Sequence, residues 1–142
     1  MFLVDTNVVS ELRKAKAGKA DRNVARWAQS VPAAALFLSA ITIQELGIGT
    51  LLAERRDRSQ GAILRAWLED HVLPAFADRI LPVDTAVARA SAALHVPDPR
   101  PIRDSLIAAT ALVHRLTVVT HDVGDFELTG ARVLDPWLGV DE

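Results

Sequence analysis

Four acidic residues of this sequence stand where a folded chain could gather carboxylates around a divalent cation. Asp5 directly follows the apolar run at residues 2–4, and Asp122 lies three residues after the β-branched run that ends at Val119. Two further acids lie near the expected starts of helices, Glu45 and Asp104. Like charges brought together repel one another, so such a cluster would require a cation. Carboxylate oxygens favour Mg²⁺ or Mn²⁺ over zinc.

Each acid also has a purely structural interpretation. Asp5 could cap the first helix, and Asp104 could offset the positive end of a helix dipole beside Arg103. Thr42 and Glu45 match a capping box, in which a hydroxyl and an acid three residues later close a helix start. No one of these interpretations explains why the acids fall together at the ends of strands and the starts of helices.

Other kinds of catalytic site lack the residues they need. The chain has no cysteine, which excludes disulfides, thiolate ligands and a cysteine nucleophile. No pair of histidines has zinc-finger spacing, and no Ser–His–Asp arrangement has a supporting motif. His121 abuts Asp122 and is either a polar loop residue or a substrate contact.

Short apolar runs alternate with helical patterns along the chain, which is typical of an α/β fold. Strands are expected at 2–4, 36–38, 80–81, 116–119 and 132–134, and helices at 8–12, 21–28, 42–53, 63–72, 87–94 and 102–115. We expect a single domain over 1–142, with a central, mostly parallel twisted sheet of four to five short strands flanked by helices. Ligands of such sheets bind beyond the carboxyl ends of the strands, where Asp5 and Asp122 should emerge.

Length and composition fit one ordinary globular domain. The chain has 142 residues and a formal net charge of −2, from 16 basic and 18 acidic residues. It has no apolar run long enough to span a membrane, and its start lacks the pattern of a signal peptide. We therefore expect a cytoplasmic protein without a membrane partner.

Four sequence blocks resemble the PIN-domain ribonucleases, in particular the VapC toxins of VapBC toxin–antitoxin pairs and their FitB-like branch. The blocks are LVDTNVVSE at 3–11, LSAITIQEL at 38–46, DSLIAATA at 104–111 and THDVGDF at 120–126. The ending VLDPW at 133–137 also resembles the FitB-like branch. The resemblance covers nearly the whole chain and implies a PIN-like fold.

The resemblance implies that Asp5, Glu45, Asp104 and Asp122 form the catalytic, metal-binding quartet of the family. Many relatives have Asn at the position of Asp122 and a second acid where this chain has Asp125. Asp125 is thus a ligand, a supporting residue or a cap, and we rank Asp122 above it. Accessory roles are expected for three polar neighbours, Thr6 at a metal-bound water or phosphate oxygen, and Asn7 and Thr120 in orienting the residues around them.

By the same resemblance, the chain is expected to be the toxin of a type II toxin–antitoxin system and an endoribonuclease dependent on Mg²⁺, with Mn²⁺ as a substitute. The expected partners are a VapB-like antitoxin, an RNA substrate such as tRNA or rRNA, and a second copy of the chain. DNA would be bound only through the antitoxin. The alternative is a FitB-like regulatory partner of a DNA-binding protein, with minor or no nuclease activity.

An acidic site needs basic residues nearby if it is to hold RNA. Arg13, Arg55 and Arg56 are candidates for RNA contacts, with lysines at 14, 16 and 19 and an arginine at 58 beside them. Such runs are also common at solvated helix ends, and the sequence does not separate the two interpretations.

Overall fold

The strands of this protein form one parallel sheet in the order β3-β2-β1-β4-β5. The computed structural model describes residues 1–139, so residues 140–142 of the predicted domain lie outside the described residues. All four pairings between neighbouring strands are parallel. This confirms the predicted α/β class. The strands are β1 (Phe2–Val4), β2 (Leu36–Ser39), β3 (Ile80–Leu81), β4 (Thr117–Val119) and β5 (Val133–Leu134).

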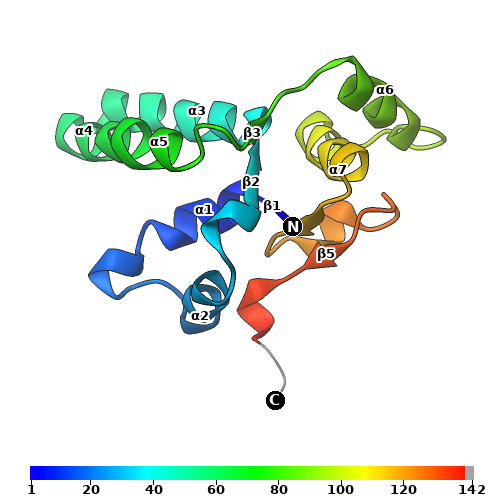
Figure 1. The fold of residues 1–142 in the computed structure, drawn as a ribbon. Coiled ribbons are helices and arrows are strands. Elements are labelled where there is room, and N and C mark those ends of the chain that lie inside the picture. The colour runs from blue at the N-terminus through cyan, green and yellow to red at the C-terminus, as the bar shows by residue number, and fades with distance from the viewer. Residues whose placement is uncertain (140–142) are drawn as a thin grey trace.

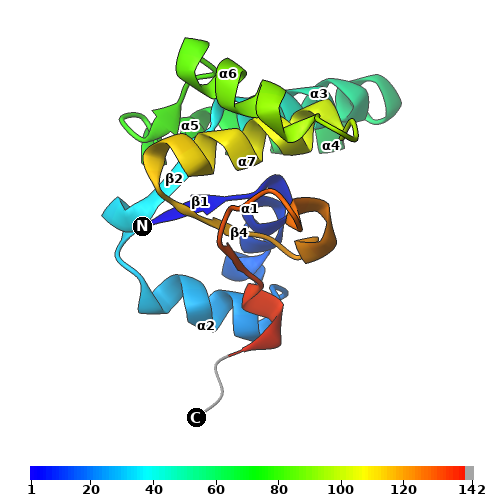
Figure 2. The ribbon, with the colours of Figure 1, turned by 90° about the vertical axis from the view of Figure 1, so that its right-hand side faces the viewer.

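Helices cover both faces of the sheet. The α-helices are α1 (Thr6–Leu12), α2 (Arg22–Ser30), α3 (Ala40–Arg56), α4 (Arg58–Trp67), α5 (Leu73–Ala75), α6 (Thr85–Leu94) and α7 (Ile102–His114). In Figure 1, α3 and α4 extend side by side to one side of the sheet. Figure 2 shows α6 and α7 over one face of β1 and β4 and α2 beneath the other. None of the described helices is long and apolar enough to cross a membrane.

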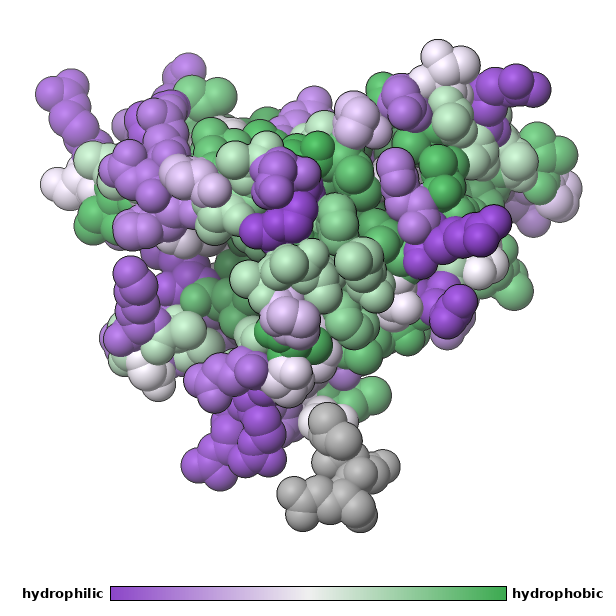
Figure 3. Space-filling model, in the orientation of Figure 1, coloured by the Kyte–Doolittle hydropathy of each residue, from purple (hydrophilic) through white to green (hydrophobic). Residues whose placement is uncertain are grey.

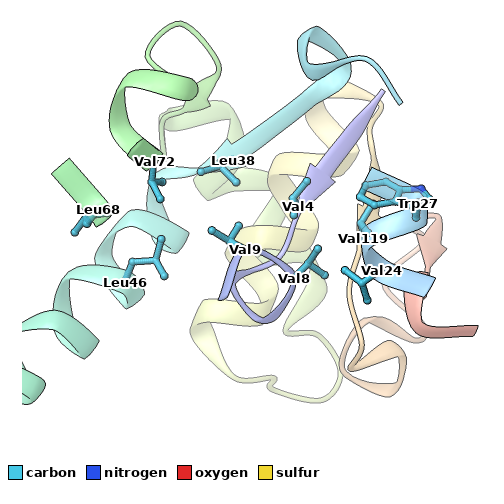
Figure 4. Packing of buried hydrophobic residues seen from close by; sticks show 10 residues of the cluster. All are labelled: Val4, Val8, Val9, Val24, Trp27, Leu38, Leu46, Leu68, Val72 and Val119. Atoms are coloured by element: carbon cyan, nitrogen blue, oxygen red, sulfur yellow. The ribbon is translucent and has the colours of Figure 1, made fainter. Parts of the chain in front are cut away.

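Successive side chains of β1 and β4 point to opposite faces of the sheet, so the hydrophobic core is divided into one cluster on each face. Leu3 and Val118 belong to a cluster with Ile107 of α7, whereas Val4 and Val119 pack in the opposite cluster. Figure 4 shows this second cluster, to which α1, α2 and α3 contribute Val8, Val9, Val24, Trp27 and Leu46. Because both faces are covered, these strands appear in the sequence as unbroken apolar runs.

The predicted capping box at the start of the third long helix is wrong. Ser39 caps α3 instead, because its backbone is still extended and its hydroxyl accepts a hydrogen bond from the Ile41 amide at 3.0 Å. Thr42 is already inside the helix and is fully buried. Glu45 is therefore free of any capping role and lies on the second turn of α3. Elsewhere Asp21 caps α2 and Asp84 caps α6.

The helix expected over 63–72 is interrupted. It ends as α4 at Trp67 and continues as a π-helical turn, Leu68–Val72, before α5. Pro74 accounts for the change, because proline lacks an amide hydrogen and its ring clashes with the carbonyl four residues earlier; a wider turn accommodates both effects. The exposed stretch at 14–19 contains a short 3₁₀ turn, Ala15–Ala17.

Close packing of α4 on α3 depends on one glycine. A Cβ atom built on Gly61 would lie 2.5 Å from the Cα atom of Glu54, well inside van der Waals contact. Arg65 of α4 then reaches Glu54, with its Nε 2.7 Å and its Nη2 2.9 Å from the two carboxylate oxygens. The two helices thus approach backbone to backbone at Gly61.

We predict that Gly61→Ala lowers the free energy of unfolding by about 1–3 kcal/mol, because the added methyl group meets backbone that cannot move aside cheaply. Gly49→Ala is the matched control, since a Cβ at this helical position meets nothing within 4 Å. It should be neutral, or stabilising by up to about 1 kcal/mol. Urea unfolding measures both, and equal losses in the two variants would contradict the close approach.

Candidate active site

Asp5 lies at the carboxyl end of β1, in the middle of the sheet. The Thr120 hydroxyl donates a hydrogen bond to its Oδ2 at 2.8 Å, and the Thr6 amide donates one to its Oδ1 at 2.8 Å. The second bond makes Asp5 the N-cap of α1. Only 9% of Asp5 is exposed. The structural and chemical interpretations of this residue are therefore compatible, because capping holds the carboxylate at the strand edge.

Asn7 connects this carboxylate to the loop after β4. Its Nδ2 donates to the Thr120 hydroxyl at 3.2 Å and to Oδ2 of Asp122 at 3.0 Å. Its Oδ1 accepts a hydrogen bond from the His121 amide at 3.3 Å, and the Asp122 amide donates to the Thr120 hydroxyl at 3.0 Å. These bonds fix where Asp122 emerges relative to Asp5.

Glu45 reaches the same edge from α3 and is held from two sides. The Thr6 hydroxyl donates to Glu45 Oε1 at 2.9 Å, and Nη1 of Arg103 lies 3.2 Å from Oε2. The sequence analysis did not assign Arg103 any part in the site. Its position directly before Asp104, at the start of a helix, was the one sequence feature that could have indicated such a part. The structure makes it the basic neighbour of the acid cluster.

Asp104 projects from the first turn of α7 and is electrostatically coupled to the other acids. Burial raises its pKa, and the charges of Asp125, Glu45 and Asp122 raise it further, while Arg103 opposes them. Burial likewise raises the pKa of Asp5 to about 6 against the hydrogen bonds it accepts, with smaller contributions from Glu45 and Asp104. Glu45 and Asp104 thus lie near enough to Asp5 to act on its charge, and Glu45 and Asp122 lie near enough to act on that of Asp104.

Asp122 and Asp125 both lie on the exposed segment after β4. Asp122 precedes the 3₁₀ turn Val123–Phe126, and Asp125 lies within that turn. Asp125 acts more strongly than Asp122 on the pKa of Asp104, whereas Asp122 is the one held by Asn7. The ranking of Asp122 above Asp125 as a metal ligand therefore stays a prediction.

The donor set at this edge suits a hard cation, because every candidate ligand is a carboxylate or hydroxyl oxygen. Within residues 1–139, no three acidic or histidine side chains converge closely enough to form a ready-made metal cage. Mg²⁺ in proteins is usually held by one or two carboxylates and several waters, so a complete cage is not required. Burial is the main cause of the raised pKa values of Asp5 and Asp104, and neighbouring carboxylates add to it; a bound cation would favour the charged form of both groups.

The residues predicted to contact RNA lie at different places. Arg13 lines a cavity together with Glu45 and Thr6, next to the acid cluster. Arg55 and Arg56 lie in the last turn of α3, about 15 Å along the helix axis from Glu45. His121 stacks on Trp137, with ring centroids 4.4 Å apart, and its Nδ1 lies 3.5 Å from Asp135.

Comparison with known proteins places this chain and its fold in a recognised class. Residues 2–130 match the model of the PIN domain. The chain is 39% identical to a VapC ribonuclease of Sinorhizobium fredii, over 96% of this chain and 98% of that protein. It is 38% identical to the toxin FitB of Neisseria gonorrhoeae, over 96% and 99% of the two chains. The chain therefore belongs to the PIN-domain family.

The solved structures agree with this assignment. The FitAcB complex of Neisseria gonorrhoeae contains a chain that is 37% identical and superposes with a TM-score of 0.86, over 96% of this chain and 99% of that one. A FitAB complex bound to a DNA fragment matches at 33% identity and a TM-score of 0.87, over 100% and 99%. The homologues of this protein are thus VapC and FitB toxins of toxin–antitoxin systems, as the sequence motifs predicted.

The raised pKa of Asp5 predicts a pH-dependent stability. Between pH 3.8, its ordinary pKa, and about 6, the folded state retains a proton that the unfolded chain has released. The free energy of unfolding therefore decreases as pH rises through this window, by about 3 kcal/mol in total. Asp5→Asn removes this contribution, so its unfolding free energy should fall less between pH 4 and pH 7 than that of the wild type.

Urea unfolding at several pH values measures the two slopes. Asp70→Asn, at an exposed position outside the acid cluster, should keep the wild-type slope. Identical slopes for the wild type and Asp5→Asn would show that burial does not perturb this carboxyl group.

Proposed function

We propose that this chain is a divalent-metal-dependent endoribonuclease and acts as the toxin of a type II toxin–antitoxin pair in the cytoplasm. The observation that carries the proposal is that Asp5, Glu45 and Asp104, from three separate elements, lie near enough at one sheet edge for the charges of Glu45 and Asp104 to raise the pKa of Asp5. Two of these acids have raised pKa values, which is common at catalytic sites. The ribonuclease name of a 39% identical relative supports RNA as the substrate.

The carboxylates of Asp5, Glu45, Asp104 and Asp122 would hold Mg²⁺ or Mn²⁺ at this edge. The ion, when bound, lowers the pKa of a coordinated water and polarises the phosphoryl oxygens. Thr120 and the Thr6 amide each donate to one oxygen of Asp5, which fixes the orientation of its carboxylate. Arg103, whose side chain is 60% exposed, is placed to contact a phosphate oxygen beside Glu45.

We predict that the purified protein cleaves RNA with Mg²⁺ or Mn²⁺ and that EDTA abolishes the cleavage. Asp104→Asn should lose it as well, because the variant removes a ligand charge while keeping the shape of the side chain. Cleavage of a fluorophore–quencher RNA measures the rate, and titration calorimetry measures Mn²⁺ binding separately. Asp98→Asn, at an exposed position outside the cluster, is the matched control. Wild-type cleavage and Mn²⁺ binding by Asp104→Asn would refute the proposed site.

Partners are proposed from the surface and from the relatives. Large apolar side chains of α3 and α4 are exposed, with Leu51, Leu52 and Ile63 each more than half accessible. Exposed apolar residues gathered on neighbouring helices are typical of protein interfaces. Two relatives with 33–37% identity occur in FitAB-type complexes. We propose that this chain forms a homodimer and is inhibited by a VapB-like antitoxin.

A second candidate function is regulatory. The FitAB complex that contains a 33% identical chain is bound to a DNA fragment. This favours a role in which the present chain works with a DNA-binding partner. In this alternative the nuclease activity would be minor or absent. DNA contact through the antitoxin is compatible with both functions, so RNA cleavage by the free chain is what separates them.

We predict that expression of the chain alone arrests bacterial growth and that co-expression of its antitoxin restores it. Light scattering should give the mass of a dimer for the free chain, and promoter DNA should shift in a gel only when the antitoxin is present. Asp104→Asn should still form the complex and shift the DNA without arresting growth. Arrest by Asp104→Asn equal to that by the wild type would contradict nuclease toxicity.

A further inference from the structure

A cavity of about 200 Å³ opens beside the acid cluster, between α1, α3 and the end of α4. We call it the α1–α3 cavity. Thr6 and Glu45 line it and also belong to the acid cluster, so the cavity and the proposed catalytic edge are continuous. The lining of the cavity also includes Ser10, Arg13, Gly49 and Trp67.

The outer wall of this cavity offers a flat stacking surface. Trp67, half-buried at the end of α4, lies under the guanidinium group of Arg13, whose Cζ is 5.8 Å from the ring centroid. Indole rings and guanidinium planes are the groups on which proteins stack unpaired bases. One side of the Trp67 ring is therefore in contact with Arg13, while Trp67 also contributes to the lining of the cavity.

The inner wall is polar near the acids and open at the helix. Ser10 supplies a hydroxyl that can donate and accept hydrogen bonds. A Cβ atom built on Gly49 meets nothing within 4 Å, so the space of the cavity reaches the backbone of α3 at this residue. The combination of a flat apolar wall, polar edges and an adjacent acidic site suits a planar heterocycle with hydrogen-bonding edges.

We infer that the α1–α3 cavity receives the base of the nucleotide next to the scissile phosphate of single-stranded RNA. The inference rests on the proposed nuclease function and adds a base-binding subsite to it, formed by the lining of the α1–α3 cavity. A phosphate contacted by Arg103, beside Glu45 at the edge of the cavity lining, would have its neighbouring base within reach of the cavity. Stacking on Trp67 fixes the base, and the hydroxyl groups of Thr6 and Ser10 meet its edge.

The charge around the cavity favours a polyanion over a peptide. Arg13 also lines a larger neighbouring cavity of about 450 Å³, together with Lys16 and His71. In Figure 3 the surface is indented on the left, between the part that carries α4 and α5 and the part that carries α1 and α2. A strand leaving the acid cluster along this indentation passes basic side chains that can contact its phosphates.

Filling the cavity tests the inference. Gly49→Leu places a side chain in the open space, and Gly47→Leu is the matched control, because Gly47 lies on the same helix, also has nothing within 4 Å of a built Cβ, and does not line this cavity. The probe is a pool of single-stranded oligoribonucleotides of random sequence, whose cleavage products are sequenced. Wild type and Gly47→Leu should share a base preference beside the cleaved bond, and Gly49→Leu should lose it.

Binding gives a readout that does not depend on cleavage. In the Asp104→Asn background, fluorescence anisotropy measures the Kd of a labelled oligoribonucleotide and of the same strand with abasic riboses. In Asp104→Asn alone, the abasic strand should bind about tenfold more weakly than the normal strand, which is the scale of one lost stacking interaction. In the double variant Asp104→Asn/Gly49→Leu, the two strands should have the same Kd. Trp67→Leu, which removes the stacking ring of a half-buried residue but keeps an apolar side chain, repeats the test if Gly49→Leu does not fold.

Two results would overturn the inference. In one, Gly49→Leu and Trp67→Leu keep the wild-type base preference and the full effect of abasic substitution. In the other, both variants bind RNA normally but lose the antitoxin, which would assign the cavity to a protein partner. Failure of the proposed function gives a different result. Wild type and Asp104→Asn would then cleave RNA at the same rate, while the Kd values from anisotropy would still show whether the cavity binds a base.

Discussion

The burial of carboxylates at the carboxyl edge of the sheet, to which their mutual repulsion adds, is the constraint on which the rest of this structure depends. A buried Asp5 with a pKa near 6 is held in place by hydrogen bonds that favour its charged form and is opposed by burial and by its acidic neighbours. Such an arrangement lowers stability, so the surrounding fold must compensate. The two covered faces of the sheet and their clusters of buried aliphatic side chains supply that compensation.

The hydrogen bonds around the acids form a connected network that draws on several elements. Thr6 connects β1 and α1 to Glu45 of α3, and Asn7 connects α1 to the loop after β4. Arg103 then joins α7 to α3 by its ion pair with Glu45. Asp5, Glu45 and Asp122 are thus each oriented by a residue from another element, which is how a site built at loop ends acquires a defined geometry.

The sequence predicted the sheet and its acidic edge because both depend on local patterns. Short apolar runs followed directly by Asp5, or closely by Asp122, indicate strand ends, and parallel strands put those ends on one side. The role of Glu45 was less accessible, since a local capping pattern with Thr42 competed with it, and Ser39 takes the cap only because β2 ends there. The Arg103–Glu45 pair joins residues 58 positions apart, and no local pattern reports such a contact. The break at Leu68 was missed for a different reason, because helical periodicity hardly changes across a single wide turn.

The central place of β1 in the sheet limits how early the protein can fold during its synthesis. Among the described strands, the central one is made first, and one of its two neighbours, β4, is made more than 100 residues later. Asp5 and Thr120 are hydrogen-bonded across 115 positions of sequence. A nascent chain therefore cannot assemble the acidic edge until the segment that carries Thr120 has been translated. The proposed ribonuclease activity would in this way stay absent while the intervening helices are made, and would arise only once β4 pairs with β1.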